Sequence, residues 1–254
     1  MREMGNRVDQ TGAADIRKPE QSDAGLTCAE RQLLKLYQSI DFGRNEVCRS
    51  CRRETPGLTR PVGAWAVGKN FYLHETRLLF VGKNARGEPG DLCLDFRSGF
   101  RASRDWLWRK QWPYWSYTRK ISENIYGDDS IENIAFTNIV KCNDSMGRDT
   151  TSSFTKDYCI CELNVIGREI AIIDPTHIVF YTSWGYDEHI RRVFDSFETV
   201  QSTEIAIGRK KMPWLEATGV CGGKHIRILR TGHPERMKKA DYVSAICEWV
   251  QRTG

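Results

Sequence analysis

The sequence predicts an α/β protein with a three-layer α/β/α architecture and a central four-stranded parallel sheet. Four short apolar runs, rich in β-branched residues and bounded by turn residues, are typical of buried parallel strands. Segments with helical spacing of apolar residues lie between and after them, and such alternation favours a parallel sheet covered by helices on both faces. The expected strands are 77–82, 133–140, 176–183 and 225–231, and the expected helices are 103–111, 162–173, 186–197 and 235–251.

The chain is expected to form one domain over residues 26–254, preceded by a tail. Residues 1–25 are polar and lack apolar periodicity, which predicts disorder. Thr27 is followed three residues later by Glu30, the pattern of a capping box, and apolar residues at helical spacing follow. A helix is therefore expected to open the folded part.

Composition favours a protein of the cytoplasm that does not enter membranes. Of the 254 residues, 40% are apolar and 28% charged. No apolar run reaches the roughly 18 residues that cross a bilayer, and the first residues lack the apolar core of a secretory signal. The net charge of +5 is compatible with nucleic-acid binding but too small for a strong non-specific binder.

Tryptophans interleaved with basic residues fill the segment RDWLWRKQWPYWSYTRK, residues 104–120. Two interpretations stay open for it. The tryptophans could cover the core at helical spacing, or part of the segment could line a nucleic-acid groove by stacking on bases and contacting phosphates.

Polar residues follow the expected strands, where parallel sheets place their ligand crevice. The first strand runs into a turn with Gly82 and Gly87 at its ends and Asn84 inside it, and Asn138 lies near the end of the second. His233 follows the fourth strand and precedes the last expected helix, whose positive end would favour a neutral imidazole. A solvated turn, a structural asparagine and a structural histidine are the alternatives. The pattern predicts one ligand or active site at these turns.

Four cysteines have a spacing that indicates a metal centre. Cys48 and Cys51 form a CxxC pair, Cys142 closes the second strand, and Cys159 follows, with Cys161 as its alternative. Zinc and iron-sulfur clusters both accept four thiolates. The cysteines at 28, 93, 221 and 247 are interpreted as small, at least partly buried apolar residues.

Taken in order, these features resemble the uracil-DNA glycosylase superfamily, with its iron-sulfur branch, the family 4 type, as the closest match. The CxxC pair, the glycine-bounded turn, the segment IAFTNIVKC with a later cysteine, and the turn GHP cover nearly the whole chain from residue 27 to 251. The resemblance implies a uracil-DNA glycosylase-like domain over residues 26–254. It also implies a structural 4Fe-4S cluster, with zinc as the alternative, on Cys48, Cys51, Cys142 and Cys159.

The resemblance also assigns roles at the strand ends. Asn84 would position a water molecule, Asn138 would recognise the edge of the base, and His233 would stabilise the leaving base as an anion. Gly82 would allow the close approach of the substrate. Phe100, with Phe96 as runner-up, would stack on the flipped base.

The implied function is that of a DNA repair hydrolase, expected to be a monomer, that cleaves the N-glycosidic bond of uracil or a related damaged base in DNA. The sequence departs from the family at Lys83, where the branch has an acid, at Ala85, where proline is usual, and at Glu235, where serine is usual. These departures indicate slower catalysis. They also keep open the alternative of a weak or inactive iron-sulfur protein that binds nucleic acid.

Overall fold

The fold is described from a computed structural model of the chain. It describes residues 25–58, 61, 66–84, 100, 104–105, 107, 109–127, 130–143, 151–235 and 237–252. The expected tail before residue 25, Ala85, Phe96, Cys93 and parts of the expected helix 103–111 lie outside these residues.

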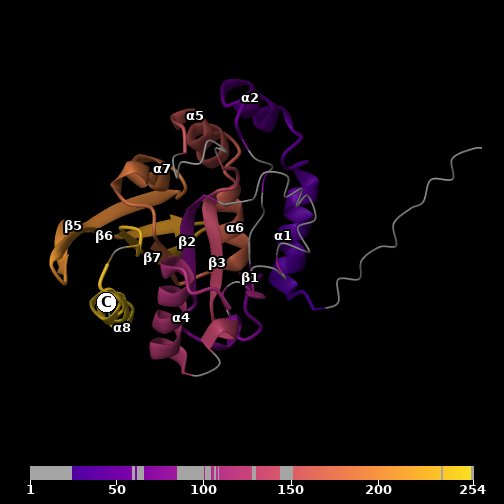
Figure 1. Ribbon diagram of the computed structural model, residues 1–254. Coiled ribbons are helices and arrows are strands. Elements are labelled where there is room, and N and C mark those ends of the chain that lie inside the picture. Colours follow the sequence, from indigo (N-terminus) through magenta and orange to yellow (C-terminus); the bar gives the residue numbers. More distant parts are fainter. Residues whose placement is uncertain are drawn as a thin grey trace, which may run out of the picture.

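A seven-stranded mixed sheet forms the centre of the molecule, in the order β1-β3-β2-β4-β7-β6-β5 (Figure 1). Its strands are β1 Ala66–Val67, β2 Leu78–Asn84, β3 Ala135–Val140, β4 His177–Phe180, β5 Ser196–Ile207, β6 Lys210–Cys221 and β7 Lys224–Thr231. The pairs β3–β2, β2–β4 and β4–β7 are parallel, and the other three pairs are antiparallel. The mixed α/β class is confirmed, whereas the expected sheet of four parallel strands alone is incomplete, because long antiparallel strands extend it.

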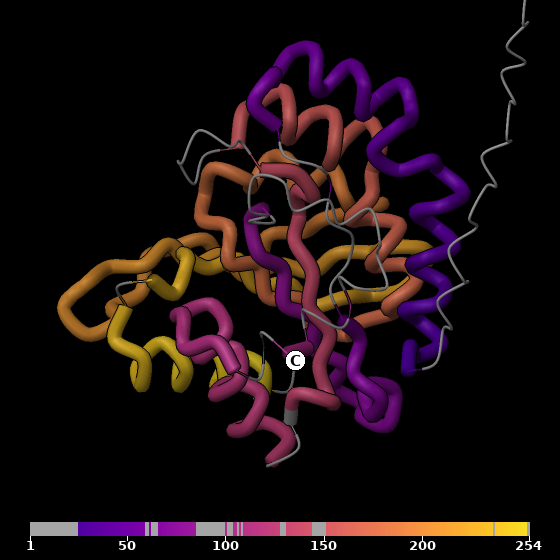
Figure 2. The backbone as a smooth tube through the Cα atoms, turned by 45° about the vertical axis from the view of Figure 1, so that its right-hand side comes forward, coloured from indigo at the N-terminus to yellow at the C-terminus, as the bar shows by residue number. Residues whose placement is uncertain are grey.

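Two hairpins add β5 and β6 to one edge of the sheet, and the short strand β1 pairs with β3 at the other edge. Gly208 has φ 61° at the first position of the β5–β6 loop, and Gly222 and Gly223 have φ 58° and 78° in the β6–β7 loop, the positive φ angles that two-residue hairpin turns favour. The β5–β6 hairpin reaches beyond the rest of the sheet, close to the C-terminal helix (Figure 2). The expected helix 186–197 is wrong in its second half, because α7 ends at Arg191 and β5 begins at Ser196.

Helices cover both faces of the sheet and one of its ends. They are α1 Cys28–Ser39, α2 Glu46–Glu54, α4 Pro113–Tyr126, α5 Ser153–Lys156, a π-helix Asp157–Glu162, α6 Val165–Ile173, α7 Asp187–Arg191 and α8 Lys239–Gln251. Helices α1 and α6 share one buried apolar cluster with the sheet, and α4 and α8 share the other. Helices α2, α5 and α7 gather beyond the carboxyl ends of β2 and β3 (Figure 1).

Local signals explain where the first helix begins. The Glu30 N–H donates to Thr27 Oγ1 and the Thr27 N–H donates to Glu30 Oε2, which confirms the predicted capping box.

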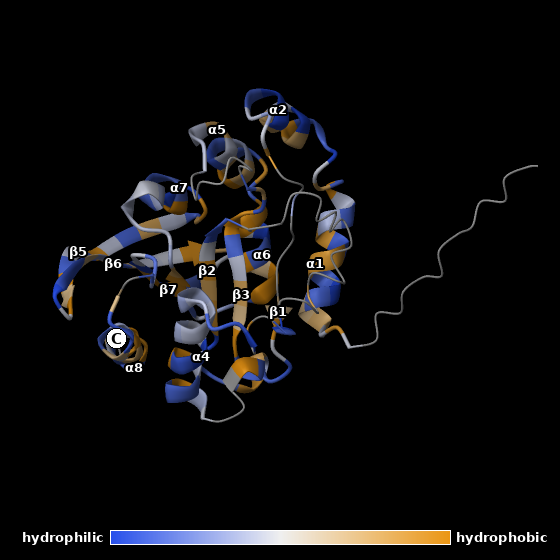
Figure 3. Ribbon diagram, viewed as in Figure 1, coloured by the Kyte–Doolittle hydropathy of each residue, from blue (hydrophilic) through white to orange (hydrophobic). Residues whose placement is uncertain are grey.

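Orange, apolar faces of α1 and α6 lie toward the strands, whereas the outer end of the β5–β6 hairpin is largely hydrophilic (Figure 3). Among the described helices, none combines the length and the apolar character that a membrane span needs.

Candidate metal centre and strand-end site

The CxxC pair lies on helix α2. The Asn45 side chain caps α2 by accepting a hydrogen bond from the Cys48 N–H at 2.8 Å. Cys48 and Cys51 lie three residues apart on this helix, and residues with that spacing share one helix face. The helix therefore presents both thiols in the same direction.

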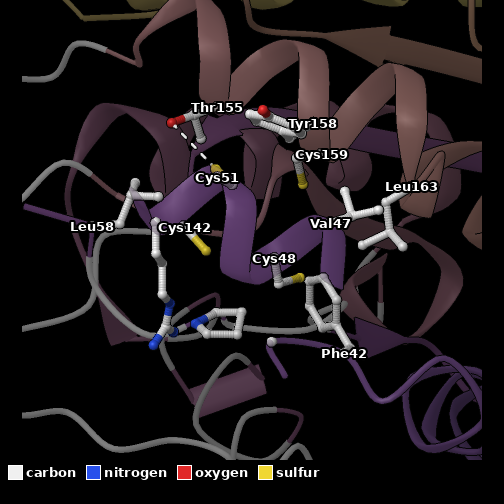
Figure 4. A pocket seen from close by; sticks show the side chains of 13 residues that line it. Phe42, Val47, Cys48, Cys51, Leu58, Cys142, Thr155, Tyr158, Cys159 and Leu163 are labelled. Carbon is white, nitrogen blue, oxygen red and sulfur yellow. Dashed lines mark hydrogen bonds between the residues drawn. The ribbon is translucent and has the colours of Figure 1, made fainter. Parts of the chain in front are cut away.

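All four predicted ligand cysteines line one pocket (Figure 4). Cys48 and Cys51 come from α2, Cys142 follows β3, and Cys159 comes from the π-helix. None of the four forms a disulfide. The fold thus brings together thiols from distant parts of the sequence, with Cys48 and Cys159 lying 111 positions apart.

Burial in this pocket disfavours the charged thiolate form of the four cysteines when no metal is bound. Burial raises the pKa of all four thiols, to about 12 for Cys159. The pKa of Cys142 is raised further by the neighbouring Cys159, Cys48 and Cys51, because like charges would repel one another. Thiolates are the metal-binding form, so the positive charge of bound metal would offset both effects. The donor set fits a metal centre.

The spacing of the four thiols can be compared with the spacing that a single zinc ion requires. A tetrahedral zinc ion with bonds near 2.3 Å holds its sulfur ligands roughly 3.8 Å apart. Among the described residues, the one group of at least three metal-binding side chains whose ligand atoms all lie within 4.8 Å of one another does not include these four. No three of these four thiols therefore have their sulfur atoms all within 4.8 Å of one another.

Cys159 and Cys161 point to different places. Cys159 is buried and lines the pocket, whereas Cys161 does not line it. In the π-helix, whose Leu163 N–H donates to the Tyr158 carbonyl five residues earlier, residues two apart face opposite sides. The geometry favours Cys159 as the fourth thiol of the pocket.

At the strand ends, Gly82 and Asn138 are direct partners across β2 and β3. A Cβ atom on Gly82 would lie 2.2 Å from Asn138 Oδ1 and 3.0 Å from Cε2 of Tyr114. The Tyr114 ring in turn stacks beside His233, with ring centroids 6.4 Å apart and planes at 18°. The structure therefore brings together Gly82, Asn138 and His233, with Tyr114 between them.

The surroundings of His233 define its tautomer. The Glu235 N–H donates to His233 Nδ1 at 3.2 Å, so the proton of a neutral ring lies on Nε2. Helix α8 begins only at Lys239, which corrects the expectation that His233 sits at the helix N-terminus. The backbone hydrogen bond sets the tautomer of a neutral ring, and the Glu235 carboxylate lies 3.9 Å from the same Nδ1.

Asn84 lies near the same edge but has its own partner. Its Nδ2 donates to Oδ1 of Asn143 at 2.7 Å, and Asn84 is only 9% exposed. Phe100, by contrast, is fully buried in the cluster shared with α1 and α6, whereas Tyr114 packs against the cluster shared with α4 and α8. The structure therefore places Phe100 on the opposite face of the sheet from Tyr114 and does not bring it to Asn138.

Three residues near the two sites were missed in the sequence: Tyr114, Asn143 and Glu169. Tyr114 belongs to the Trp-rich segment, where the buried Trp115 agrees with the core interpretation; Trp112 is 59% exposed, and the nucleic-acid interpretation stays a prediction. Asn143 follows Cys142 directly, and no spacing pattern marks it. Glu169 sits within an apolar helix, where an isolated acid is a signal of a buried partner.

That partner is Lys141, and the pair lies behind the cysteine pocket. Lys141 Nζ is 2.6 Å from Glu169 Oε2, and both side chains are fully buried. The Tyr37 hydroxyl donates to Glu169 Oε1 at 2.5 Å and the Thr137 hydroxyl donates to Oε2 at 2.9 Å. Lys141 immediately precedes Cys142, so this ion pair fixes the end of β3 from which that thiol projects.

Gly82 offers a direct test of the strand-end geometry. We expect Gly82→Ala to displace Asn138 or Tyr114 and to lower the free energy of unfolding by about 1–3 kcal/mol, the usual cost of overpacking. Gly185→Ala is the matched control, because a Cβ there would meet nothing within 4 Å. Thermal unfolding of both variants measures the effect, and equal melting temperatures would contradict the close packing.

Comparison with known proteins adds no relative: no family model, no curated protein and no solved structure matches the chain.

Proposed function

We propose that the chain is a DNA glycosylase of the uracil-DNA glycosylase superfamily that hydrolyses the N-glycosidic bond of uracil or a related damaged base. One observation carries the proposal: Cys48, Cys51, Cys142 and Cys159, which the sequence indicates as metal ligands, line a single pocket. A second supports it, since Gly82, Asn138 and His233 meet around Tyr114. The parallel strands β3, β2, β4 and β7 would be the family's central sheet.

In this proposal the four cysteines hold a 4Fe-4S cluster with a structural task. When bound, the cluster would supply a covalent link between α2, the end of β3 and the π-helix. The wide spacing of the thiols favours a cluster over zinc.

Base recognition falls to the residues around Gly82. The amide of Asn138 has both a donor and an acceptor and can pair with the edge of a flipped uracil. Gly82 has no side chain to block a base that approaches Asn138. Because Phe100 lies on the other face of the sheet, Tyr114 is the aromatic residue that we propose for stacking on the base.

Bond cleavage would rest on His233 and Asn84. The Nε2–H of His233 would donate to the oxygen of the departing base, where negative charge develops. Asn84 gives its Nδ2–H to Asn143, so its Oδ1 is the atom that would accept a hydrogen bond from the attacking water. An amide is a poor general base, and the rate would depend mainly on stabilisation of the leaving group.

A glycosylase assay tests the function. We expect purified protein to leave abasic sites in uracil-containing oligonucleotides and Asn138→Ala to reduce the rate at least about 100-fold, because the base then loses its bidentate partner. Asn70→Ala is the control: Asn70 lies outside the strand ends, its side chain makes no capping hydrogen bond, and activity should stay unchanged. The absence of abasic product on uracil, hypoxanthine, xanthine and mismatch substrates would refute the proposal.

One observation favours a second candidate, a nucleic-acid-binding protein of the same fold without chemistry. The Tyr114 ring packs against Gly82 in the space beside Asn138 that the base would use, and Lys83 adds a positive charge instead of the acid of the branch. This candidate expects DNA binding that weakens steeply with salt and yields no abasic product.

A further inference from the structure

We propose that Asp157, Cys161 and His189 form a second metal site, separate from the cysteine pocket, that binds a single zinc ion. Their ligand atoms all lie within 4.8 Å of one another, and in the part of the chain that the structure describes they are the one group of three or more potential ligands with this property. The inference does not depend on the glycosylase function.

The site joins two elements beyond the carboxyl ends of the strands. Asp157 and Cys161 are four residues apart in the π-helix and therefore share one of its faces, opposite the face of Cys159. His189 lies on α7, which packs against the π-helix. Its Nε2 is 3.1 Å from Asp157 Oδ1. Two rigid elements thus present three donors to one point.

The donor types select the metal. Thiolate, imidazole and carboxylate together suit zinc, whereas calcium and magnesium require oxygen ligands throughout. Tetrahedral zinc, with bonds of roughly 2.0–2.3 Å, separates its ligand atoms by roughly 3.3–3.8 Å. The three donors lie within 4.8 Å of one another, so side-chain movements on the order of 1 Å would bring them to that spacing. A water molecule would take the fourth position.

Charge and access also fit a divalent cation. The Cys161 thiolate and the Asp157 carboxylate together neutralise the two charges of zinc, and the proton of the thiol leaves to solvent on binding. The Asp157 side chain is 51% exposed and that of His189 17%, so an ion can reach the site from solvent.

The neighbouring cysteines make a sharp experiment possible. Anaerobically purified protein is incubated with one equivalent of zinc chloride, desalted, and analysed for zinc and iron by mass spectrometry. We expect one zinc per wild-type chain, beside the iron. Cys161→Ser and His189→Ala should each raise the dissociation constant for zinc, measured against a chromophoric chelator, at least tenfold and leave the iron content unchanged. Cys159→Ser should lose iron and keep zinc.

The controls separate this site from stray zinc in the cysteine pocket. Cys28→Ser removes an exposed thiol at the start of α1 and should keep both metals. Equal zinc affinity in wild type and Cys161→Ser, or no zinc retained by wild type, would overturn the proposal. Unchanged circular dichroism of each variant shows that a loss of zinc is not a loss of fold. Because zinc is measured without DNA, a failure of glycosylase activity leaves the result untouched.

Discussion

Replacement of Lys141 by methionine is expected to lower the free energy of unfolding by about 3–5 kcal/mol, since it breaks a fully buried ion pair and leaves an acid without its partner. Lys141 Nζ lies 2.6 Å from Glu169 Oε2, and neither side chain is exposed. Tyr37 and Thr137 would still donate to Glu169, but no positive charge would remain to balance the carboxylate. For a chain of this size, each kcal/mol corresponds to roughly 2–4 °C in melting temperature.

A double variant separates the broken pair from the lost packing. Lys141→Met combined with Glu169→Leu replaces both charges by apolar groups of similar size, and such replacements of buried pairs are often close to neutral. We therefore expect the double variant to melt well above Lys141→Met alone. A double variant no more stable than the single one would show that the charge imbalance is not what destabilises the protein. If the proposed cluster is bound, the iron content of the same samples reports whether the end of β3 still presents Cys142.

The parallel strands could be predicted because burial on both faces leaves a simple signal. Residues 78–81 of β2, for example, form an uninterrupted apolar run, and all four are buried. The β5–β6 hairpin has no such run. Its β5 strand is exposed along most of its length, so polar residues alternate with few apolar ones. The sequence therefore predicts a helix that continues to residue 197, past the start of this strand. The glycine pair at 222–223 is the hairpin signal that was available in the sequence.

The cysteine pocket was predictable and the aromatic environment of the strand ends was not. Cysteine is rare and chemically distinctive, so spacing alone selected four thiols that the fold brings together. Phenylalanine and tyrosine are common core residues, and their distance from a helix does not reveal the face of the sheet on which they lie. Phe100 and Tyr114 lie on opposite faces, a difference that depends on chain paths no periodicity encodes.

Removal of the His233 ring should have the largest effect on catalysis. We expect His233→Ala to lower the single-turnover rate of base release about 100- to 1,000-fold, the cost of losing one donor to a developing anion. The variant should fold normally, because the His233 side chain is 29% exposed. His225→Ala is the matched control, since this exposed histidine lies at the opposite end of β7 and should retain full activity.

A third variant tests whether His233 acts as a neutral hydrogen-bond donor. The Glu235 N–H donates to Nδ1, which places the donor proton on Nε2, and a glutamine at this position can offer an amide N–H in a similar place. His233→Gln should therefore recover part of the rate that alanine loses, with DNA affinity unchanged in all three proteins. A glutamine variant as slow as the alanine variant would instead indicate that the positive charge of the ring, and not its N–H, stabilises the leaving base. In that case the rate of the wild type would fall with rising pH, because the ring loses its proton.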